Sequence, residues 1–377
     1  MRPPFAPALL LLAAAGAQAM PIPAPPQFAA KSYVLMDANS GQVIAASAPD
    51  LHRAPASLTK LMTSYVVFHA LKEGVIHLDD TALISERAWR MGGSRMFANL
   101  GSHVSIDDLL QGMIVQSGND ATVALAERVG GSEDAFVSLM NQYAGTLGLQ
   151  NSHFLDASGD TDDRSHYSTA RDLALLSRAI VAEFPEYLHY FSEKDFFWNK
   201  IHQKNRNDLL FTDPSVDGLK TGHTDSAGYC LVATAKRQDM RLIAVVLGAK
   251  TEKARAQYAG ALLDYGTNFF ESRKLYAAGA LVAGVTVWKG AESSVPVGSL
   301  GDLYVTLPKG SGGDLHATVT ASSGLIAPVA AHQQVGTLDV AVGDRVLARV
   351  PLYTLQAVPQ GNLFRRLFDT VRLWFKK

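Results

Sequence analysis

Ser57-Leu58-Thr59-Lys60 stands at the start of a predicted helix that continues to Lys72. A serine and a lysine three residues apart on a helix project from one face toward the same space. A serine hydroxyl becomes a nucleophile when a base takes its proton, and a neutral lysine amine can be that base. Burial and a neighbouring cation lower a lysine pKa from its ordinary value of about 10.4. This stretch therefore predicts a nucleophile, Ser57, beside a base, Lys60.

Two further strings extend this pattern. Ser117-Gly118-Asn119 follows a predicted helix and begins a predicted loop, where a hydroxyl and an amide can point into a cleft. Lys220-Thr221-Gly222-His223 precedes a strand, as expected of an edge strand that pairs with a peptide. Lys220 would supply the neighbouring cation and would also hold an anionic substrate. Each string alone has an ordinary structural explanation, but together the three predict one acyl-transfer site.

The composition is that of an ordinary globular protein. The chain has 377 residues, 47% of them hydrophobic and 18% charged, which suffices for two domains. Its formal net charge of −1 gives no field that would attract nucleic acid, so no nucleic-acid partner is expected. The eleven histidines are scattered and no H-E-x-x-H string occurs, so we expect neither a metal nor a cofactor. Cys230 is the only cysteine, and its apolar neighbours predict a buried strand position.

Hydrophobic periodicity predicts an α+β domain in which an antiparallel sheet carries a helical insert. Its predicted strands are 33–36, 42–46, 229–235 and 241–247, and its predicted helices are 57–72, 106–115, 120–129, 132–147, 169–184 and 252–270. After about Lys274, short Val-rich runs alternate with Gly, Ser and Asp, which is typical of a small all-β domain. We interpret that domain as a spacer or docking module.

Both ends carry sorting signals. Arg2, the apolar stretch 6–16 and Ala17-Gln18-Ala19 predict a secretory signal peptide, because the apolar run is shorter than the roughly 20 residues that span a bilayer. At the other end, aromatic and aliphatic residues between 363 and 375 recur at helical spacing opposite a basic face. A terminal helix docked on the protein's own core is the alternative; the mixture of Trp, Phe and basic residues favours a membrane-surface helix. The predicted parts are a signal peptide (1–19), a catalytic domain (20–272), an all-β domain (273–356) and an amphipathic helix (357–377).

Segments around the three strings show a family resemblance. With Met96-Phe97, 105–127, 132–143 and 217–229, the chain resembles the low-molecular-weight penicillin-binding proteins, specifically D-alanyl-D-alanine carboxypeptidases of the penicillin-binding protein 5/6 type. The similarity covers nearly the whole mature chain, including the β-rich domain and the terminal helix. It implies a serine β-lactamase/transpeptidase-like catalytic domain.

The resemblance also implies roles for the site residues. Ser57 would be acylated, Lys60 would take its proton, and Ser117 with Asn119 would assist proton relay and hold the substrate amide. The substrate-binding residues would be the strand residues Lys220, Thr221, Gly222 and His223. Lys220 would position the terminal carboxylate, and the backbone N–H groups of Ser57 and His223 would form the oxyanion hole.

The implied enzyme removes the last D-alanine from peptidoglycan stem pentapeptides and is acylated by β-lactam antibiotics. It would be periplasmic and peripherally attached to the inner membrane, with the C-terminal helix on the anionic lipid surface. One departure from the family is the stretch 158–163, Ser-Gly-Asp-Thr-Asp-Asp, which bears on deacylation and substrate preference.

Three alternatives remain open at this stage. A serine β-lactamase shares the acylation step, but class A enzymes add a glutamate-activated water, and no E-x-x-L-N or Tyr-x-Asn string occurs here. An endopeptidase that cuts peptide cross-links would share the fold and the motifs. A membrane-tethered scaffold with a dead site is disfavoured because all three strings are intact.

Overall fold

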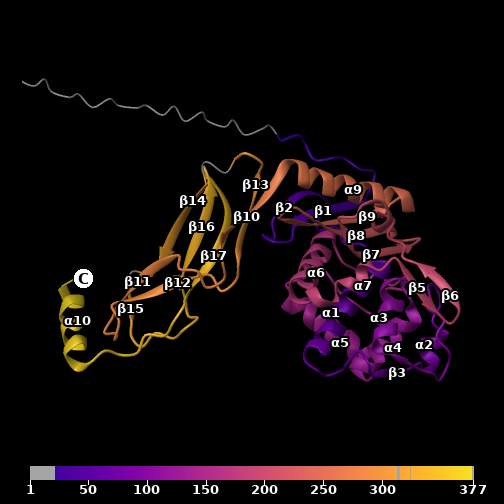
Figure 1. The fold of residues 1–377 in the computed structure, drawn as a ribbon, viewed down its shortest axis with the longest axis horizontal. Coiled ribbons are helices and arrows are strands. Elements are labelled where there is room, and N and C mark those ends of the chain that lie inside the picture. The colour runs from indigo at the N-terminus through magenta and orange to yellow at the C-terminus, as the bar shows by residue number, and fades with distance from the viewer. Residues whose placement is uncertain (1–21, 312–314, 323, 376–377) are drawn as a thin grey trace, which may run out of the picture. The chain divides into compact units, whose positions relative to one another are not determined.

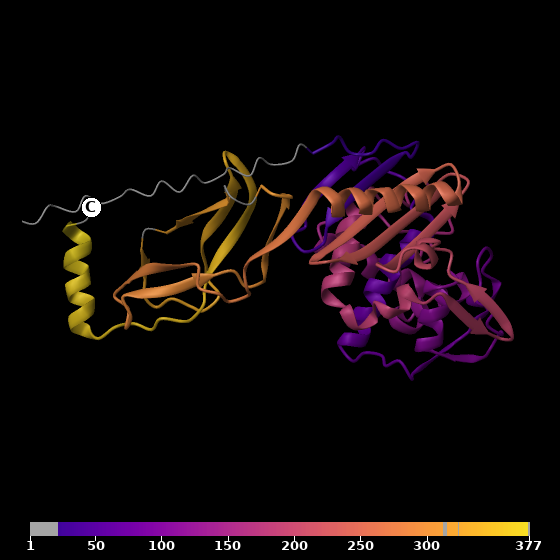
Figure 2. The same cartoon turned by 45° about the horizontal axis from the view of Figure 1, so that its top comes forward.

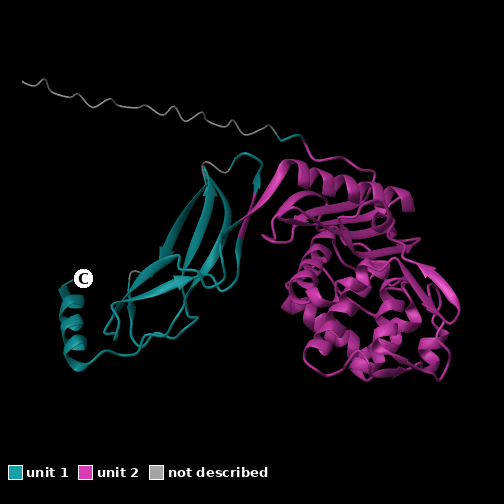
Figure 3. Cartoon of the chain, in the orientation of Figure 1, with its two compact units in different colours: residues 1–23, 274–303, 307–377 teal, residues 24–273, 304–306 magenta. Residues whose placement is uncertain are grey.

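The computed structural model describes residues 22–311, 315–322 and 324–375. The predicted signal peptide, residues 1–19, lies outside the described residues. The described residues form two compact units (Figure 3). One comprises Ala24–Arg273 with Tyr304–Thr306, and the other is formed by the described residues of 274–303 and 307–375, with Ile22 and Pro23. The α+β fold followed by an all-β domain, predicted from the sequence, is confirmed.

A five-stranded antiparallel sheet organises the first unit, in the order β2-β1-β9-β8-β7. Its strands are β1 (Ser32–Asp37), β2 (Val43–Ser47), β7 (Val216–Thr224), β8 (Gly228–Arg237) and β9 (Met240–Ala249). Successive side chains of a strand point to opposite faces, so Tyr33 and Leu35 enter one core while Val34 and Met36 enter another. The sheet is therefore covered on both faces, and β7 forms one of its edges.

One long helix covers the first face, and a group of helices covers the second (Figures 1 and 2). The covering helix is α9 (Glu252–Phe269), and α6 (Ala170–Glu183) packs on the opposite face. The other helical elements are η1 (Ala56–Thr59), α1 (Lys60–Lys72), α2 (Glu86–Arg90), α3 (Ile106–Ile114), α4 (Asn119–Gly130), α5 (Glu133–Thr146), η2 (Pro185–Tyr187), α7 (His189–Ser192) and α8 (Leu209–Thr212). Ser or Thr side chains cap α2, α3, α5, α6 and α9 by accepting a backbone N–H of the first turn.

Two short two-stranded sheets in this unit were not predicted from the sequence. β3 (Thr81–Leu83) pairs with β4 (His103–Ser105), and β5 (Asp195–Trp198) pairs with β6 (Ile201–Lys204). Each has strands of only three or four residues, which is too short for a clear alternating pattern.

The second unit is built on a six-stranded sheet in the order β14-β16-β17-β12-β11-β15. Its strands are β11 (Ala283–Trp288), β12 (Ser294–Gly298), β14 (Leu315–Ala321), β15 (Leu325–Ile326), β16 (Gln334–Val342) and β17 (Arg345–Thr354). A separate two-stranded sheet joins β10 (Phe270–Tyr276) and β13 (Leu303–Pro308). Alternate apolar side chains such as Val285, Val287, Leu338 and Val340 form the buried side of this unit.

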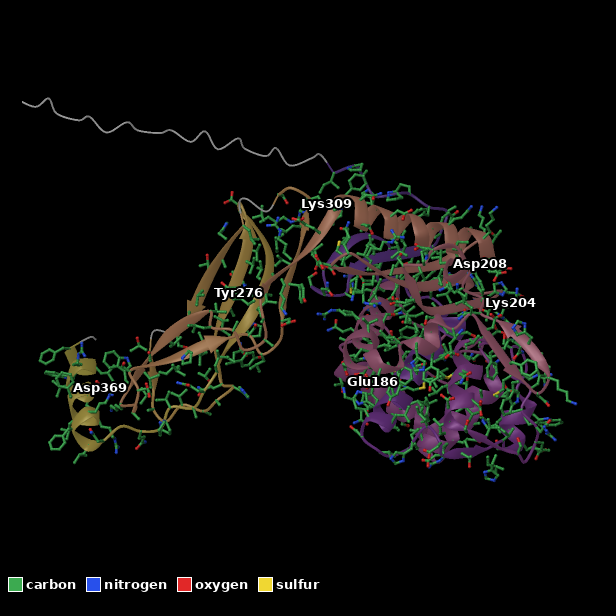
Figure 4. The ribbon with its side chains drawn as sticks, in the orientation of Figure 1. Glu186, Lys204, Asp208, Tyr276, Lys309 and Asp369 are labelled. Carbon is green, nitrogen blue, oxygen red and sulfur yellow. The ribbon has the colours of Figure 1, made fainter. Side chains whose placement is uncertain are left out.

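The terminal helix α10 (Leu363–Phe375) contacts the second unit through its polar side. Asp369 is only 8% exposed and accepts a hydrogen bond from the backbone N–H of Lys289 at 2.6 Å (Figure 4). Arg365 donates to the carbonyl of Ala291 at 2.9 Å. Leu373 is half-buried, and the other seven large apolar residues of the helix are exposed by 52% to 85%: Leu363, Phe364, Leu367, Phe368, Val371, Trp374 and Phe375. The helix is therefore not docked on the core of its own domain, because its apolar side chains face away from that domain.

Candidate active site

Ser57 and Lys60 meet where η1 passes into α1. Lys60 is fully buried, and its Nζ lies 3.1 Å from Ser57 Oγ, 2.7 Å from Asn119 Oδ1 and 2.8 Å from the carbonyl oxygen of Ser158. The last two oxygens can only accept hydrogen bonds, so they take the two hydrogens of a neutral amine. The remaining direction, occupied by the lone pair of the neutral amine, faces Ser57 Oγ. The geometry thus suits Lys60 to take a proton from Ser57.

Burial is the main reason that Lys60 can be neutral. The pKa of Lys60 is lowered to about 7, chiefly by burial; Arg206 contributes to the lowering, while Asp156, Asp160 and Asp120 oppose it. From the sequence, burial was expected to act together with Lys220 as the neighbouring cation. Lys220 is itself 2% exposed, and its own pKa is lowered well below the ordinary value by burial first and by Lys60 second. Lys220 is therefore a second perturbed amine rather than a fixed cation.

Ser117 and Asn119 lie in the tight connection between α3 and α4. The prediction that this string begins a loop was wrong, because Asn119 already opens α4, with Gly118 as its N-cap. Ser117 has a φ of 67°, a left-handed conformation that is strained for a serine, and such strain concentrates at functional sites. Its hydroxyl is buried and has no hydrogen-bond partner within the described part of the chain. The Asn119 amide reaches Lys60 on one side and donates to the Gly92 carbonyl at 2.9 Å on the other.

The third string lies on the edge strand β7, which packs directly on η1. Lys220, Thr221 and Gly222 are buried, whereas His223 is exposed and its ring lies 4.1 Å from that of Tyr229. A Cβ added at Gly222 would lie 3.0 Å from the carbonyl oxygen of Pro55 and 3.2 Å from the backbone nitrogen of Leu58. Glycine thus allows the strand to approach the turn that carries Ser57.

A cleft of about 580 Å³ opens over these three elements. Its lining includes Ser57, Ser117, Thr221, Gly222 and His223, together with Gly93, Ser94, Arg95, Phe97, Gln116, Arg206, Tyr229, Glu252 and Arg255. All eight residues predicted for the site from the sequence either line this cleft or, as with Lys60, Asn119 and Lys220, are buried next to residues that do.

Three arginines that line the cleft were not predicted from the sequence: Arg95, Arg206 and Arg255. Arg255 on α9 is 3% exposed, lies over the ring of Tyr229, and has a pKa lowered chiefly by burial. It donates to the backbone carbonyl of Arg206 at 3.1 Å. Arg206, Arg255 and Lys220 together make the cleft suitable for binding an anion. No motif places Arg206 and Arg255 there, since α9 and the segment before α8 meet only in the folded unit.

The segment 93–98, between α2 and β4, forms another wall of the cleft. Asp120 accepts hydrogen bonds from the backbone N–H groups of Met96, Phe97 and Ala98, at 2.9, 2.9 and 3.2 Å. Asn119 donates its own backbone N–H to the carbonyl of Ser94 at 2.7 Å. These bonds hold the wall against the start of α4, beside the Ser117 hydroxyl.

Among the described residues, no three His, Cys, Asp or Glu side chains are grouped as a metal site would require. The single thiol also takes no part in the cleft. Cys230 is buried on β8, and burial raises its pKa to about 11.

A serine within hydrogen-bond distance of a buried lysine, beside an edge strand and a cleft lined by arginines, is the arrangement expected of a serine acyl-transfer enzyme of the penicillin-binding class. Family models agree: D-alanyl-D-alanine carboxypeptidase matches residues 19–251, and the C-terminal domain of penicillin-binding protein 5 matches residues 270–360. The chain therefore belongs to the D-alanyl-D-alanine carboxypeptidase family, as a serine enzyme of the penicillin-binding protein 5/6 type.

Relatives support this assignment over nearly the full length. D-alanyl-D-alanine carboxypeptidase DacA of Escherichia coli K12 is 43% identical, covering 94% of this chain and 90% of its own. DacD of Salmonella typhimurium is 42% identical, covering 92% and 91%. The crystal structure of penicillin-binding protein 5 from Haemophilus influenzae matches with a TM-score of 0.84 and 44% identity, over 89% of this chain and 99% of that one.

Proposed function

We propose that Ser57 is the nucleophile and Lys60 the general base of a two-step D-Ala-D-Ala carboxypeptidase reaction. Lys60 takes the proton of Ser57 Oγ, which attacks the carbonyl carbon of the penultimate D-alanine. The backbone N–H groups of Ser57 and His223 stabilise the resulting oxyanion. The single observation that carries this proposal is the environment of Lys60 Nζ, in which two acceptors leave the third direction to Ser57 Oγ.

Ser117 completes the proton path. When the C–N bond breaks, the departing D-alanine nitrogen needs the proton that Lys60 has received. The buried Ser117 hydroxyl, which lines the cleft without a protein partner among the described residues, relays that proton. Water then attacks the acyl-enzyme carbonyl, Lys60 takes a proton from the water, and Ser57 regains its hydrogen as the shortened peptide leaves.

Lys220 binds the terminal carboxylate of the substrate, and Arg206 and Arg255 add positive charge to the same cleft. Two amines buried near each other do not both carry a proton easily. A bound carboxylate favours the protonated form of Lys220, and that charge in turn favours neutral Lys60. Substrate binding thus prepares the base.

The test is the release of free D-alanine from a peptide ending in D-Ala-D-Ala, with Ser57→Ala as the matched control. Release by the wild type and not by the variant supports the proposal. Release by both would overturn the assignment of Ser57. Release by neither, with cleavage of a cross-linked peptide by the wild type, would make the protein an endopeptidase.

The same serine is the site of β-lactam acylation. A solved relative, penicillin-binding protein D2 of Listeria monocytogenes, is described in an ampicillin-bound form and is 32% identical over 65% of this chain. The strained lactam amide occupies the place of the D-Ala-D-Ala bond. Covalent labelling by penicillin is expected for the wild type and is lost in Ser57→Ala.

The proposed location is the periplasm, with α10 resting on the surface of the inner membrane. Within the described residues, no helix combines the length and apolar character needed to cross a bilayer. α10 instead turns seven large apolar side chains outward and keeps Asp369 against its own domain. An exposed apolar face with basic residues beside it suits the boundary between headgroups and acyl chains.

A further inference from the structure

The loop 156–160 meets the active site at two points. Its Ser158 carbonyl accepts a hydrogen bond from Lys60 at 2.8 Å. Two residues further on, Asp160 Oδ2 accepts from Asn119 Nδ2 at 3.1 Å, and the same amide offers its Oδ1 to Lys60 at 2.7 Å. One side chain, Asn119, therefore separates the Asp160 carboxylate from the base.

The partners of Asn119 fix which way its amide faces. The Gly92 carbonyl and the Asp160 carboxylate only accept hydrogen bonds, so both require the NH₂ end of the amide. The carbonyl end must then face Lys60. Without the Asp160 carboxylate, only the hydrogen bond from the Asn119 amide to the Gly92 carbonyl would hold this orientation.

We propose that Asp160 is a positioning residue for acylation, whose carboxylate orients the Asn119 amide toward Lys60 and whose charge raises the pH below which acylation fails. This inference rests on the proposed role of Lys60 as the base. Asp160 does not line the cleft, so it acts through Asn119 and through its charge rather than on the substrate.

Several charged groups surround Lys60, from every element that packs on it. They are Asp156 and Asp160 from the loop, Asp120 from α4, Arg206 from the segment before α8, and Lys220 from β7. The three carboxylates favour the protonated amine and the cations disfavour it.

Asp160 differs from the other two acids in what its carboxylate does. Asp120 holds the backbone of 96–98, and Asp156 Oδ1 accepts the backbone N–H groups of Ser158 and Gly159 at 2.7 and 2.5 Å. Both are thus required for the shape of the site. The Asp160 side chain is exposed and accepts from Asn119 alone among the described residues. Its charge can therefore be removed without dismantling the site.

The experiment compares Asp160→Asn with wild type in the rate of acylation by penicillin between pH 5 and 9. Asparagine keeps an acceptor oxygen for Asn119 but removes the charge, so protonated Lys60 loses a stabilising neighbour. The acid limb of the rate profile should move to lower pH by about half a unit, making the variant about threefold faster on the acid side. High salt should reduce the difference, since the charge is exposed.

Two further variants separate charge from orientation. Asp160→Leu removes both the charge and the acceptor, so its acid limb should move as in Asp160→Asn while its rate on the plateau falls. Asp162→Asn removes an exposed charge two residues beyond Asp160, for which the described residues show no hydrogen bond or ion pair, and its profile should match the wild type.

Each other outcome is decisive. An unchanged acid limb in Asp160→Asn, or a uniform loss of rate, would overturn the inference. So would unchanged acylation with an accumulating acyl-enzyme, because Asp160 would then act on the hydrolytic water. Absence of acylation in the wild type would overturn the proposed function itself, and the inference with it.

Discussion

Gly159 is packed so tightly against Ala56 that an ideal Cβ at residue 159 would lie 1.9 Å from the Ala56 carbonyl oxygen. Gly159 also has a φ of +77°, which disfavours any side chain. We expect Gly159→Ala to lower the free energy of unfolding by about 2–4 kcal/mol, from the clash and the backbone strain together. The displaced loop would move the Ser158 carbonyl away from Lys60 and slow acylation at least about tenfold. Thermal unfolding and penicillin acylation rates measure both effects.

Gly148→Ala is the matched control for that substitution. Gly148 has a φ of +70°, but no atom lies within 4 Å of its added Cβ. Only the backbone cost of about 1 kcal/mol is expected, with unchanged acylation. If Gly148→Ala and Gly159→Ala lowered the free energy of unfolding and the acylation rate equally, the contact between Gly159 and Ala56 would not be the cause.

The pKa of Lys60 predicts a pH profile. Because this pKa is lowered to about 7 and the neutral amine is the active form, acylation should rise about tenfold per pH unit below pH 7 and level off above it. The rate constant for penicillin acylation between pH 5 and 9 measures this. A rate that is flat over this range, or that falls as the pH rises, would exclude Lys60 as the base. Lys60→Ala should remove the acid limb together with most of the activity.

The close approach of β7 to the Ser57 turn predicts the effect of Gly222→Ala. The added methyl group would press on the backbone of Pro55 and Leu58, and the strand would shift away from the turn. In the proposed oxyanion hole, this shift would move the N–H group of His223 away from that of Ser57. Loss of one such donor costs about 10²- to 10³-fold in rate, so a partial loss should slow acylation about 10- to 100-fold.

Gly260→Ala on α9 serves as its control. There the added Cβ would lie 3.5 Å from Leu209 Cδ2, an ordinary contact, and alanine favours a helix by about 1 kcal/mol over glycine. This variant should unfold at a slightly higher temperature with unchanged acylation. If Gly222→Ala also kept its acylation rate, the proposed oxyanion hole would be wrong.

How far the sequence predicts this protein depends on how local each signal is. The buried strands β8 and β9 and the helices α3, α5 and α6 follow from patterns within 9 to 14 residues, so they were predicted closely. The hairpin β5–β6 was missed because its turn residues Asn199 and Lys200 adopt positive φ without a glycine to signal it. The run of aromatic residues Phe196-Phe197-Trp198, a composition typical of strands, was the available signal.

In the active site, too, the residues within short motifs could be predicted, whereas contacts between distant segments could not. The motif residues were found because each string has fixed spacing. The contributions of Arg206, Arg255 and Asp160 arise only when distant segments meet, and sequence spacing does not record that. The cause of the Lys60 pKa was also only partly predicted, since the degree of burial depends on the whole fold, and burial outweighs the neighbouring charges.

The outward apolar face of α10 predicts binding to anionic vesicles. Phe364 and Trp374 are 85% and 75% exposed, so changing both to Ser should leave thermal unfolding unchanged. Burying each ring in a lipid surface contributes about 1.5–3 kcal/mol, so the double variant should bind vesicles at least about 100-fold more weakly. Cosedimentation with phosphatidylglycerol vesicles at low and high salt measures this, with Leu281→Ser, an exposed apolar residue outside the helix, as the control. Undiminished binding of the double variant would show that α10 is not the anchor, whereas loss of binding with full D-alanine release would separate anchoring from catalysis.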